Sequence, residues 1–364
     1  NGKWRDDKMS DKYQNTELIP EERAAYLLEE LSLDEKVAQL NCVFPFDKAS
    51  YDFAGINEQT KHGIGQVSTL EMRRMESLDE VVRWQRKVQR IVMENSPHRI
   101  PAIFHMEGAF IQDSTSFPSG IGRGAGWNPK LEEKIAEIVS RQEAACGITH
   151  VFAPVLDISR DSRMGRQGET YGEDPVLTAS LGSAYTKGCQ KYETAGRRTE
   201  SVAKHFLAFH NSAAGIHGAN SDTPERLLEE IYGKPFQAAI TEAGLRGIMP
   251  CYCLINGEPA SASHHLLTEL LREEMGFDGL CVSDYGAINN AFMFQGIGET
   301  KEETGLLCLE AGMDMELPSV EGYGEAFKNL FASGRADMDI LDRAVKRVLT
   351  AKFRMGLFEH PFAL

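Results

Sequence analysis

Residues 276–288 read GFDGLCVSDYGAI, and this stretch places a carboxylate at the end of a short apolar run. The run GLCVS has the length and composition of a buried strand, and it leads directly into Asp284. A tyrosine, a glycine and a helix-like continuation follow. Two interpretations stay open from these residues alone: Asp284 is either the N-cap of the next helix or a carboxylate nucleophile of the glycosidase type.

Six further apolar runs resemble this one, and most are separated from the next by a stretch with helical spacing. They cover residues 63–70, 100–107, 149–157, 201–209, 246–254 and 311–317. Strands that alternate with helices predict parallel βαβ units. We therefore expect an α/β fold, a (β/α)8 TIM-like barrel, with a doubly wound open sheet as the alternative.

The chain has no Gly/Ser-rich or Pro-rich linker that would divide it, so the sequence predicts one domain. We expect an N-terminal extension over residues 1–20, the barrel over 21–358 and the start of a linker over 359–364.

The 364 residues carry a formal net charge of −15, which argues against a nucleic-acid or anionic-membrane partner. No apolar run approaches the roughly 18 residues that span a bilayer, and the first residues lack the apolar core of a signal peptide. We expect a cytoplasmic protein, and a processed secreted form stays open.

Neither a metal nor a cofactor is expected. The seven cysteines are scattered, and the alternating pair Cys251 and Cys253 has no second pair at zinc-binding spacing. A G-x-G-x-x-A match begins at Gly120, but FPS precedes it where a dinucleotide-binding motif has a strand.

Several predicted strands end in polar or ionisable side chains. In a parallel barrel the carboxyl ends of the strands meet at one mouth, which is where such barrels build their sites. The residues at these ends are Glu107, Asp157, Lys204, His205, Tyr252 and Asp284.

One strand-end pair and one loop pair also have a structural alternative. Lys204 and His205 are adjacent, so on a regular strand they face opposite ways unless a twist or bulge turns both toward the mouth. Arg166 and Glu169 lie in a glycine-broken loop, RDSRMGRQGETYGEDP. The guanidinium of Arg166 either holds two neighbouring sugar hydroxyls or joins the loop to a carboxylate.

Five motifs together resemble glycoside hydrolase family 3, specifically the N-terminal barrel of its β-glucosidase and β-xylosidase members. The resemblance runs from about Tyr13 to Phe358. The motifs are LSLDEKVAQL (31–40), APVLDISRDSRMGRQGETYGEDP (153–175), VAKHF (202–206), GIMPCY (247–252) and LLREEMGFDGLCVSDYGAI (270–288).

The resemblance implies a retaining exo-β-glycosidase that removes terminal β-linked glucose or xylose from an oligosaccharide or glycoside. It implies that Asp284 is the nucleophile and that Met249 and Tyr252 line the floor beside it. The residues implied to bind sugar hydroxyls are Glu107, Arg166, Lys204 and His205.

The chain departs from the family pattern at the acid/base. In the two-domain members this glutamate lies in an α/β sandwich domain after the barrel, and that domain is absent from this sequence. We expect a missing domain or a second chain to supply the acid/base.

Single-domain β-N-acetylhexosaminidases of the family carry an Asp-x-His dyad instead, and this loop reads Gly215-Ile216-His217. Two alternatives therefore remain: a β-N-acetylhexosaminidase that uses His217 as a loop acid/base, and a sugar-binding barrel without catalysis.

Overall fold

Seven short parallel strands form the central sheet of the protein. The computed structural model describes residues 12–45, 53–108 and 114–364. Along the sheet the strands are β1 (Cys42–Val43), β2 (Gln66–Ser68), β3 (Ile103–Met106), β4 (His150–Val151), β7 (Glu200–Phe206), β9 (Gly247–Pro250) and β12 (Leu280–Cys281). All of their residues are buried, as expected for a parallel sheet that is covered on its outer face and filled inside.

Residues 313–317 close this sheet into a barrel. Met315 forms a parallel bridge with Val282, just after β12, and the backbone N–H of Glu316 donates to Leu40 O, just before β1, at 2.9 Å. The segment thus occupies the eighth position of the ring. The sequence predicted a strand here, and the structure shows only an isolated bridge. Strand β1 was not among the predicted strands, because its two residues are too few to form an apolar run.

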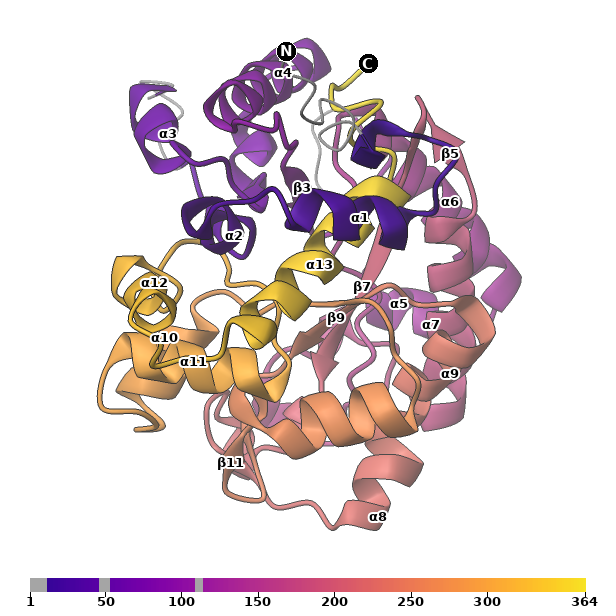
Figure 1. Cartoon of the computed structure of the whole chain (residues 1–364). Helices are drawn as coiled ribbons and strands as arrows, with labels where there is room; N and C mark the ends of the chain where they lie inside the picture. Colours follow the sequence, from indigo (N-terminus) through magenta and orange to yellow (C-terminus); the bar gives the residue numbers. More distant parts are fainter. Residues whose placement is uncertain (1–11, 46–52, 109–113) are drawn as a thin grey trace, which may run out of the picture.

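Helices surround the barrel (Figure 1). The α-helices in the described part of the chain lie between the strands and at the two ends of the barrel sequence. They are α1 (Pro20–Leu28), α2 (Leu33–Gln39), α3 (Phe53–Gln59), α4 (Leu78–Asn95), α5 (Gly120–Gly124), α6 (Pro129–Ala145), α7 (Pro175–Gln190), α8 (Glu225–Leu227), α9 (Lys234–Ala243), α10 (Ala287–Met293), α11 (Lys301–Ala311), α12 (Glu325–Ala332) and α13 (Met338–Arg354). Two π-helical segments, η7 (Leu228–Gly233) and η9 (His265–Glu274), complete the helical layer.

Short strands and 3-10 helices lie outside the central sheet. Small strands form a hairpin, β5 (Glu193–Thr194) with β6 (Arg197–Arg198), and a three-stranded sheet of β8 (Asn220–Ser221), β10 (Leu254–Ile255) and β11 (Glu258–Pro259). The short 3-10 helices are η1 (Lys12–Gln14), η2 (Leu70–Arg74), η3 (Ser162–Met164), η4 (Gln167–Glu169), η5 (Phe209–Asn211), η6 (Ala213–Gly215) and η8 (Ala260–Ala262).

The helix ends follow local rules that the sequence already displayed. The Ser32 hydroxyl accepts a hydrogen bond from Glu35 N, and the Glu35 carboxylate accepts one from Ser32 N, which makes a capping box at α2. Asp174 caps α7, with Pro175 in the first turn. Gly356 follows the C-cap of α13 with φ +72°, a conformation that glycine adopts without steric cost.

The two ends of the barrel sequence meet. Helices α1 and α13 lie side by side (Figure 1), and the guanidinium of Arg23 in α1 stacks 4.2 Å from the ring of Phe353 in α13. The same guanidinium bonds Glu359 at 2.6 Å. These contacts hold the first and last helices together on the outside of the barrel.

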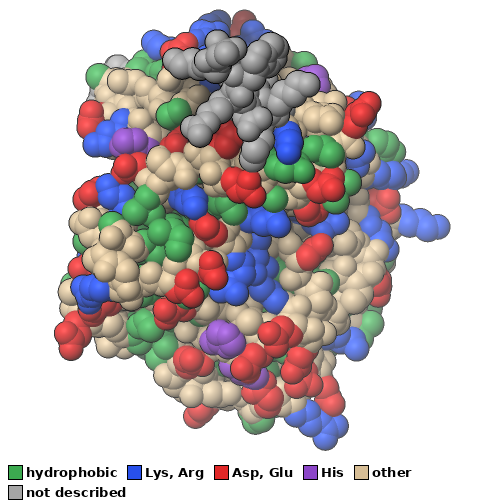
Figure 2. Space-filling view, viewed as in Figure 1, with side chains coloured by type: hydrophobic (Ala, Val, Ile, Leu, Met, Phe, Trp, Pro, Cys, Tyr) green, Lys and Arg blue, Asp and Glu red, His purple; other side chains and the backbone are tan. Residues whose placement is uncertain are grey.

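Acidic and basic side chains are interspersed on the face that Figure 2 shows, with one group of basic side chains near its centre. Among the helices within residues 12–45, 53–108 and 114–364, none is both long enough and apolar enough to cross a membrane.

Candidate active site

Asp284 lies at the carboxyl end of β12, three residues beyond the strand. Its Oδ1 accepts a hydrogen bond from Tyr285 N at 2.7 Å, and its Oδ2 lies 3.6 Å from His205 Nε2. The side chain is 14% exposed, so it is reachable from the mouth. The N-cap interpretation is wrong, because α10 begins after Gly286 and has no side-chain cap.

His205 is oriented by a buried carboxylate. Its Nδ1 lies 2.8 Å from Asp157 Oδ2, while Arg166 Nη2 lies 3.2 Å from its Nε2. Burial lowers the pKa of His205 to about 3, so the ring is neutral at physiological pH. Its proton then sits on Nδ1 and donates to Asp157, and its Nε2 accepts from Arg166.

This tautomer has a consequence for Asp284. A neutral Nε2 with its lone pair committed to Arg166 has no proton to donate to Asp284. Among the described side chains, none donates a hydrogen bond of ordinary geometry to Asp284 Oδ2. Oδ2 is thus a buried carboxylate oxygen without a hydrogen-bond donor among these side chains.

Asp157 was seen in the sequence only as a polar strand end, and its role behind His205 was not predicted. It is fully buried, and this burial raises its pKa to about 6, with the positive charge of Arg166 among the influences that oppose the rise. The signal was present, since a carboxylate that ends a buried strand needs a partner.

Arg166 connects its own loop to the barrel strands. Its Nε and Nη2 donate to the two carboxylate oxygens of Glu169 at 2.7 and 2.8 Å, and its guanidinium lies 5.3 Å from the ring centre of Phe209. Burial lowers its pKa, but the bond to Glu169 and the charges of Glu169, Asp157 and Asp284 together raise it. The predicted contact with a carboxylate exists, and the Nη2 of the same guanidinium also contacts His205 at the end of β7.

Lys204 and His205 both reach the mouth. The pairing of β7 with β9 shifts register between Lys204 and Phe206, and the Lys204–His205 peptide bond is cis. The Lys204 ammonium donates to Glu107, which follows β3, and lies 5.9 Å from the ring centre of Phe152. The irregular strand end that the sequence required for two adjacent side chains is present.

Tyr252 and Met249 come from β9 and the residues after it. The Tyr252 hydroxyl donates to Tyr285 O at 2.7 Å, and burial together with the negative charge of Asp284 raises its pKa. Met249 is buried within β9, in register with Lys204. The structure therefore brings the predicted residues from five strand ends to one mouth.

The loop residue His217 is placed differently. Its side chain is exposed, and its ring meets the ring of Phe209 edge-on at 5.4 Å. Gly215 has φ +72°, and a Cβ there would lie 2.5 Å from Arg163 C and 2.6 Å from Met164 N. An aspartate at position 215 would collide with this backbone, so the loop path itself excludes the Asp-x-His dyad.

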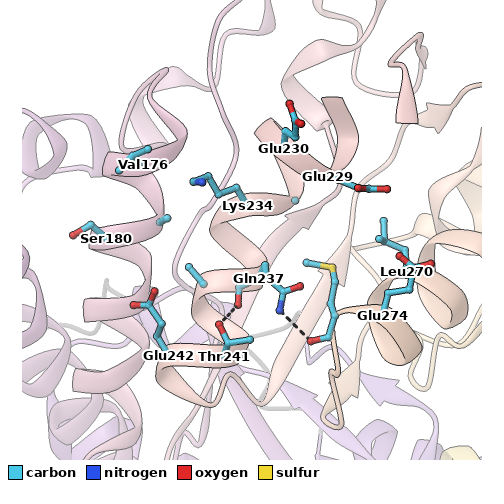
Figure 3. Close-up of a pocket in the computed structure, with 14 residues that line it drawn as sticks. Val176, Ser180, Glu229, Glu230, Lys234, Gln237, Thr241, Glu242, Leu270 and Glu274 are labelled. Atoms are coloured by element: carbon cyan, nitrogen blue, oxygen red, sulfur yellow. Dashed lines mark hydrogen bonds between the residues drawn. The ribbon is translucent and has the colours of Figure 1, made fainter. Parts of the chain in front are cut away.

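A groove of about 690 Å³ lies elsewhere, on the outer surface between α7, α9 and η9 (Figure 3). It contains none of the predicted site residues. The acidic side chains on its walls are Glu229, Glu230, Glu242 and Glu274. The two hydrogen bonds drawn there run from Gln237 Nε2 to Met275 O and from Thr241 Oγ1 to Gln237 O. The barrel mouth, where cations and carboxylates converge, is the better candidate. Within the part of the chain that the structure describes, no group of three or more His, Cys, Asp or Glu side chains is arranged to hold a metal ion.

Comparison with known proteins identifies the family of the chain. Residues 32–351 match the glycosyl hydrolase family 3 N terminal domain. The chain is 33% identical to a putative beta-xylosidase of Formosa agariphila and 32% identical to a periplasmic beta-glucosidase of Salmonella typhimurium, with 96% of this chain and 48% and 44% of those proteins covered.

Solved structures show the same relationship. A beta-glucosidase from Erythrobacter marinus superposes with a TM-score of 0.91 at 31% identity, over 98% of this chain and 48% of that one. A beta-glucosidase from Listeria innocua gives 0.83 at 28% identity, over 94% and 48%. The chain spans about half the length of these proteins, and it belongs to glycosyl hydrolase family 3, whose N-terminal domain it matches.

Proposed function

We propose that this barrel carries the nucleophile and the sugar-binding side chains of a retaining exo-β-glycosidase for terminal β-linked glucose or xylose. The observation that carries the proposal is the Asp284 carboxylate at the mouth, whose Oδ2 has no hydrogen-bond donor among the described side chains and lies 3.6 Å from the neutral His205, within the electrostatic influence of Arg166. Relatives named β-xylosidase and β-glucosidase support the sugar class.

In the proposed reaction a carboxylate oxygen of Asp284 attacks the anomeric carbon while the bond from that carbon to the leaving oxygen breaks, and the leaving oxygen takes a proton from an acid. Water then displaces Asp284 from the sugar with net retention of configuration. The reaction needs an ionised carboxylate within reach of the sugar. Positive charge on Arg166 and neighbouring Lys204 favours the anionic form of the carboxylates around them.

The remaining polar side chains suit a sugar ring. Lys204 and Glu107 form one donor–acceptor pair, and Arg166 and Glu169 form another. Neighbouring hydroxyls each need a donor and an acceptor, and such paired groups offer both. We assign Glu107, Arg166, Lys204 and His205 to the hydroxyls of the terminal sugar, with Met249 and Tyr252 forming the floor. A hydroxyl that bonds His205 Nε2 takes the place that Arg166 holds there in this structure.

The proton donor is proposed to come from a segment outside this sequence. Three other carboxylates at the mouth are already engaged: Glu107 with Lys204, Glu169 with Arg166, and Asp157 with His205. The family relatives are about twice as long as this chain, which leaves room for a second domain to supply the acid. A β-N-acetylhexosaminidase using His217 is less well supported, because position 215 has no space for the carboxylate partner.

Covalent trapping tests the proposal. A 2-deoxy-2-fluoro glucoside or xyloside with a dinitrophenolate leaving group needs little protonation, so this chain should form an adduct on Asp284 that mass spectrometry locates. Asp284→Asn should abolish the adduct, because an amide is not a nucleophile. Sugar binding without any adduct would favour the sugar-binding barrel instead, and an adduct on Asp278 or elsewhere would refute the assignment of the nucleophile.

A further inference from the structure

A layer of polar side chains crosses the inside of the barrel beneath the candidate site. Ser68, His105, His150 and Glu200 are successive register partners on β2, β3, β4 and β7. All four are at most 3% exposed. The interior of such a barrel is usually filled by bulky apolar side chains, and buried polar groups are costly unless they bond one another. This layer therefore needs an explanation.

A path of hydrogen bonds runs through part of this layer from His150 to Tyr285, with Gln66 of β2 at its centre. Gln66 Oε1 lies 2.7 Å from His105 Nδ1, and Gln66 Nε2 lies 3.4 Å from His150 Nδ1. His150 Nε2 faces Glu200 at 3.7 Å. In the other direction, His105 Nε2 lies 2.7 Å from the hydroxyl of Tyr285, the residue after Asp284.

The amide of Gln66 sets the direction of these bonds. Its oxygen can only accept, so His105 carries a proton on Nδ1. Burial lowers the pKa of His105 well below its usual value, and the ring stacks on Phe152 at 4.4 Å. A neutral His105 protonated on Nδ1 has an acceptor at Nε2, so the Tyr285 hydroxyl donates to it. Ser68 Oγ, 2.8 Å from the same hydroxyl, then donates to Tyr285.

The backbone of Tyr285 connects these hydrogen bonds to the candidate site. Its N–H donates to Asp284 Oδ1 at 2.7 Å, and its carbonyl accepts from the Tyr252 hydroxyl at 2.7 Å. The side chain of Tyr285 is thus bonded inside the barrel, and its backbone is bonded to Asp284 and Tyr252 at the mouth.

We propose that His105, oriented by Gln66, is a positioning residue that fixes Tyr285 and through it the Asp284 carboxylate. The inference rests on the proposed function, since it concerns the attack by Asp284. Without the acceptor on His105, the Tyr285 hydroxyl keeps only the bond to Ser68, and the peptide unit that holds Asp284 Oδ1 is less firmly held. A shift of this kind leaves the sugar-binding side chains in place and misdirects the attacking oxygen.

The test uses the rate and the affinity of covalent labelling as separate readouts. The probe is the dinitrophenyl 2-deoxy-2-fluoro glycoside, applied to the full chain at several concentrations. Tyr285→Phe removes the donor of the Tyr285–His105 hydrogen bond, and His105→Phe removes its acceptor. Both variants keep an aromatic ring at the substituted position. Each should lower the maximal labelling rate by about 10- to 100-fold, with a much smaller change in the half-saturating probe concentration.

Two further variants separate positioning from general damage. His105→Gln places a carbonyl oxygen near the position of Nε2 and should recover most of the rate. The double variant of His105→Phe and Tyr285→Phe should be no slower than the worse single variant, because both remove one interaction. Lys352→Met removes another buried polar group, which bonds Ile64 O before β2, and should leave the rate unchanged.

The outcomes are distinguishable. If unsubstituted protein carries no label on Asp284, the proposed function and this inference both fall. If it is labelled and both phenylalanine variants label at the unsubstituted rate, only the inference is overturned. The inference also falls if His105→Gln is as slow as His105→Phe, or if Lys352→Met slows labelling equally.

Discussion

Arg166 Nη2 donates to His205 Nε2 across 3.2 Å, and this contact ties the loop after β4 to the end of β7. Arg166 occupies the lone pair on Nε2 of the neutral His205, and Asp157 accepts the proton on Nδ1. Both ring nitrogens of His205 are therefore bonded in this structure. Arg166 therefore bonds Glu169 and His205 at once, and both contacts bear on how its variants behave.

Arg166→Ala should weaken binding of glucose or xylose analogues by roughly 1–3 kcal/mol, the usual cost of an unpaired buried polar partner. Calorimetric titration measures the affinity, and a thermal melt monitors the fold. Arg163→Ala is the matched control, since Arg163 lies in the same loop, is exposed and pairs with Asp161. The result that contradicts the assignment is a chain that unfolds while its affinity for sugar is unchanged.

Cleavage should depend strongly on the leaving group. General acid catalysis contributes about 10²–10⁴-fold, and we place the acid outside this chain. Dinitrophenyl glycosides should therefore be cleaved while cellobiose and xylobiose are cleaved slowly or not at all, as followed by release of dinitrophenolate or of monosaccharide. A family sandwich domain added by fusion should rescue the disaccharides selectively. Ordinary rates on disaccharides by this chain, lost on His217→Ala, would show that the acid is local.

Gly215→Asp should destabilise the protein rather than restore a catalytic dyad. A non-glycine residue at φ +72° costs about 1–2 kcal/mol, and here the Cβ also meets the Arg163–Met164 backbone. Gly334→Asp is a matched control, because Gly334 has the same φ of +72° and open space around it. Urea unfolding should show a larger loss for Gly215→Asp, and equal losses would disprove the steric argument.

The stability of the chain should depend on the buried pair of Glu200 and Arg354. Burial raises the pKa of Glu200, but the 2.5 Å contact with Arg354 and the neighbouring His150 outweigh it and hold the pKa at about 2, below the ordinary 4.5. A depressed carboxyl pKa stabilises the folded state above pH 4.5, and this contribution is lost as the pH falls toward 2.

Glu200→Gln should therefore lower the free energy of unfolding by roughly 3 kcal/mol at pH 7, with the difference from the unsubstituted protein shrinking below pH 4.5. Urea unfolding at a series of pH values measures this. Glu94→Gln, at an exposed position of α4, should show no such trend. A difference that is constant down to pH 3 would mean that the ion pair is not the cause.

Much of the fold could be predicted from the sequence because the signals are local. Apolar runs of strand length, helical periodicity, the capping box at Ser32 and the Asp174–Pro175 start of α7 each depend on neighbouring residues. The order of strands and helices then leaves few parallel arrangements. The site side chains at strand ends follow from the same rule, since parallel strands end at one mouth.

Other features depended on contacts between distant residues. Residues 313–317 close the ring only because Leu40 and Val282 lie on either side of them, and β1 is too short to be recognised alone. Likewise, Asp284 has the spacing of an N-cap, and only the start of α10 after Gly286 excludes that role.

The sequence by itself therefore determined the barrel class, the family motifs and which side chains stand at the strand ends. The tertiary structure decided how those side chains are paired: that Asp157 orients His205, that Gly215 has no room for a carboxylate, and that Gln66 and His105 reach Tyr285. The physical reason is that a hydrogen bond requires two atoms about 3 Å apart in a defined direction. Residues 39 or 180 positions apart satisfy it only once the barrel has closed.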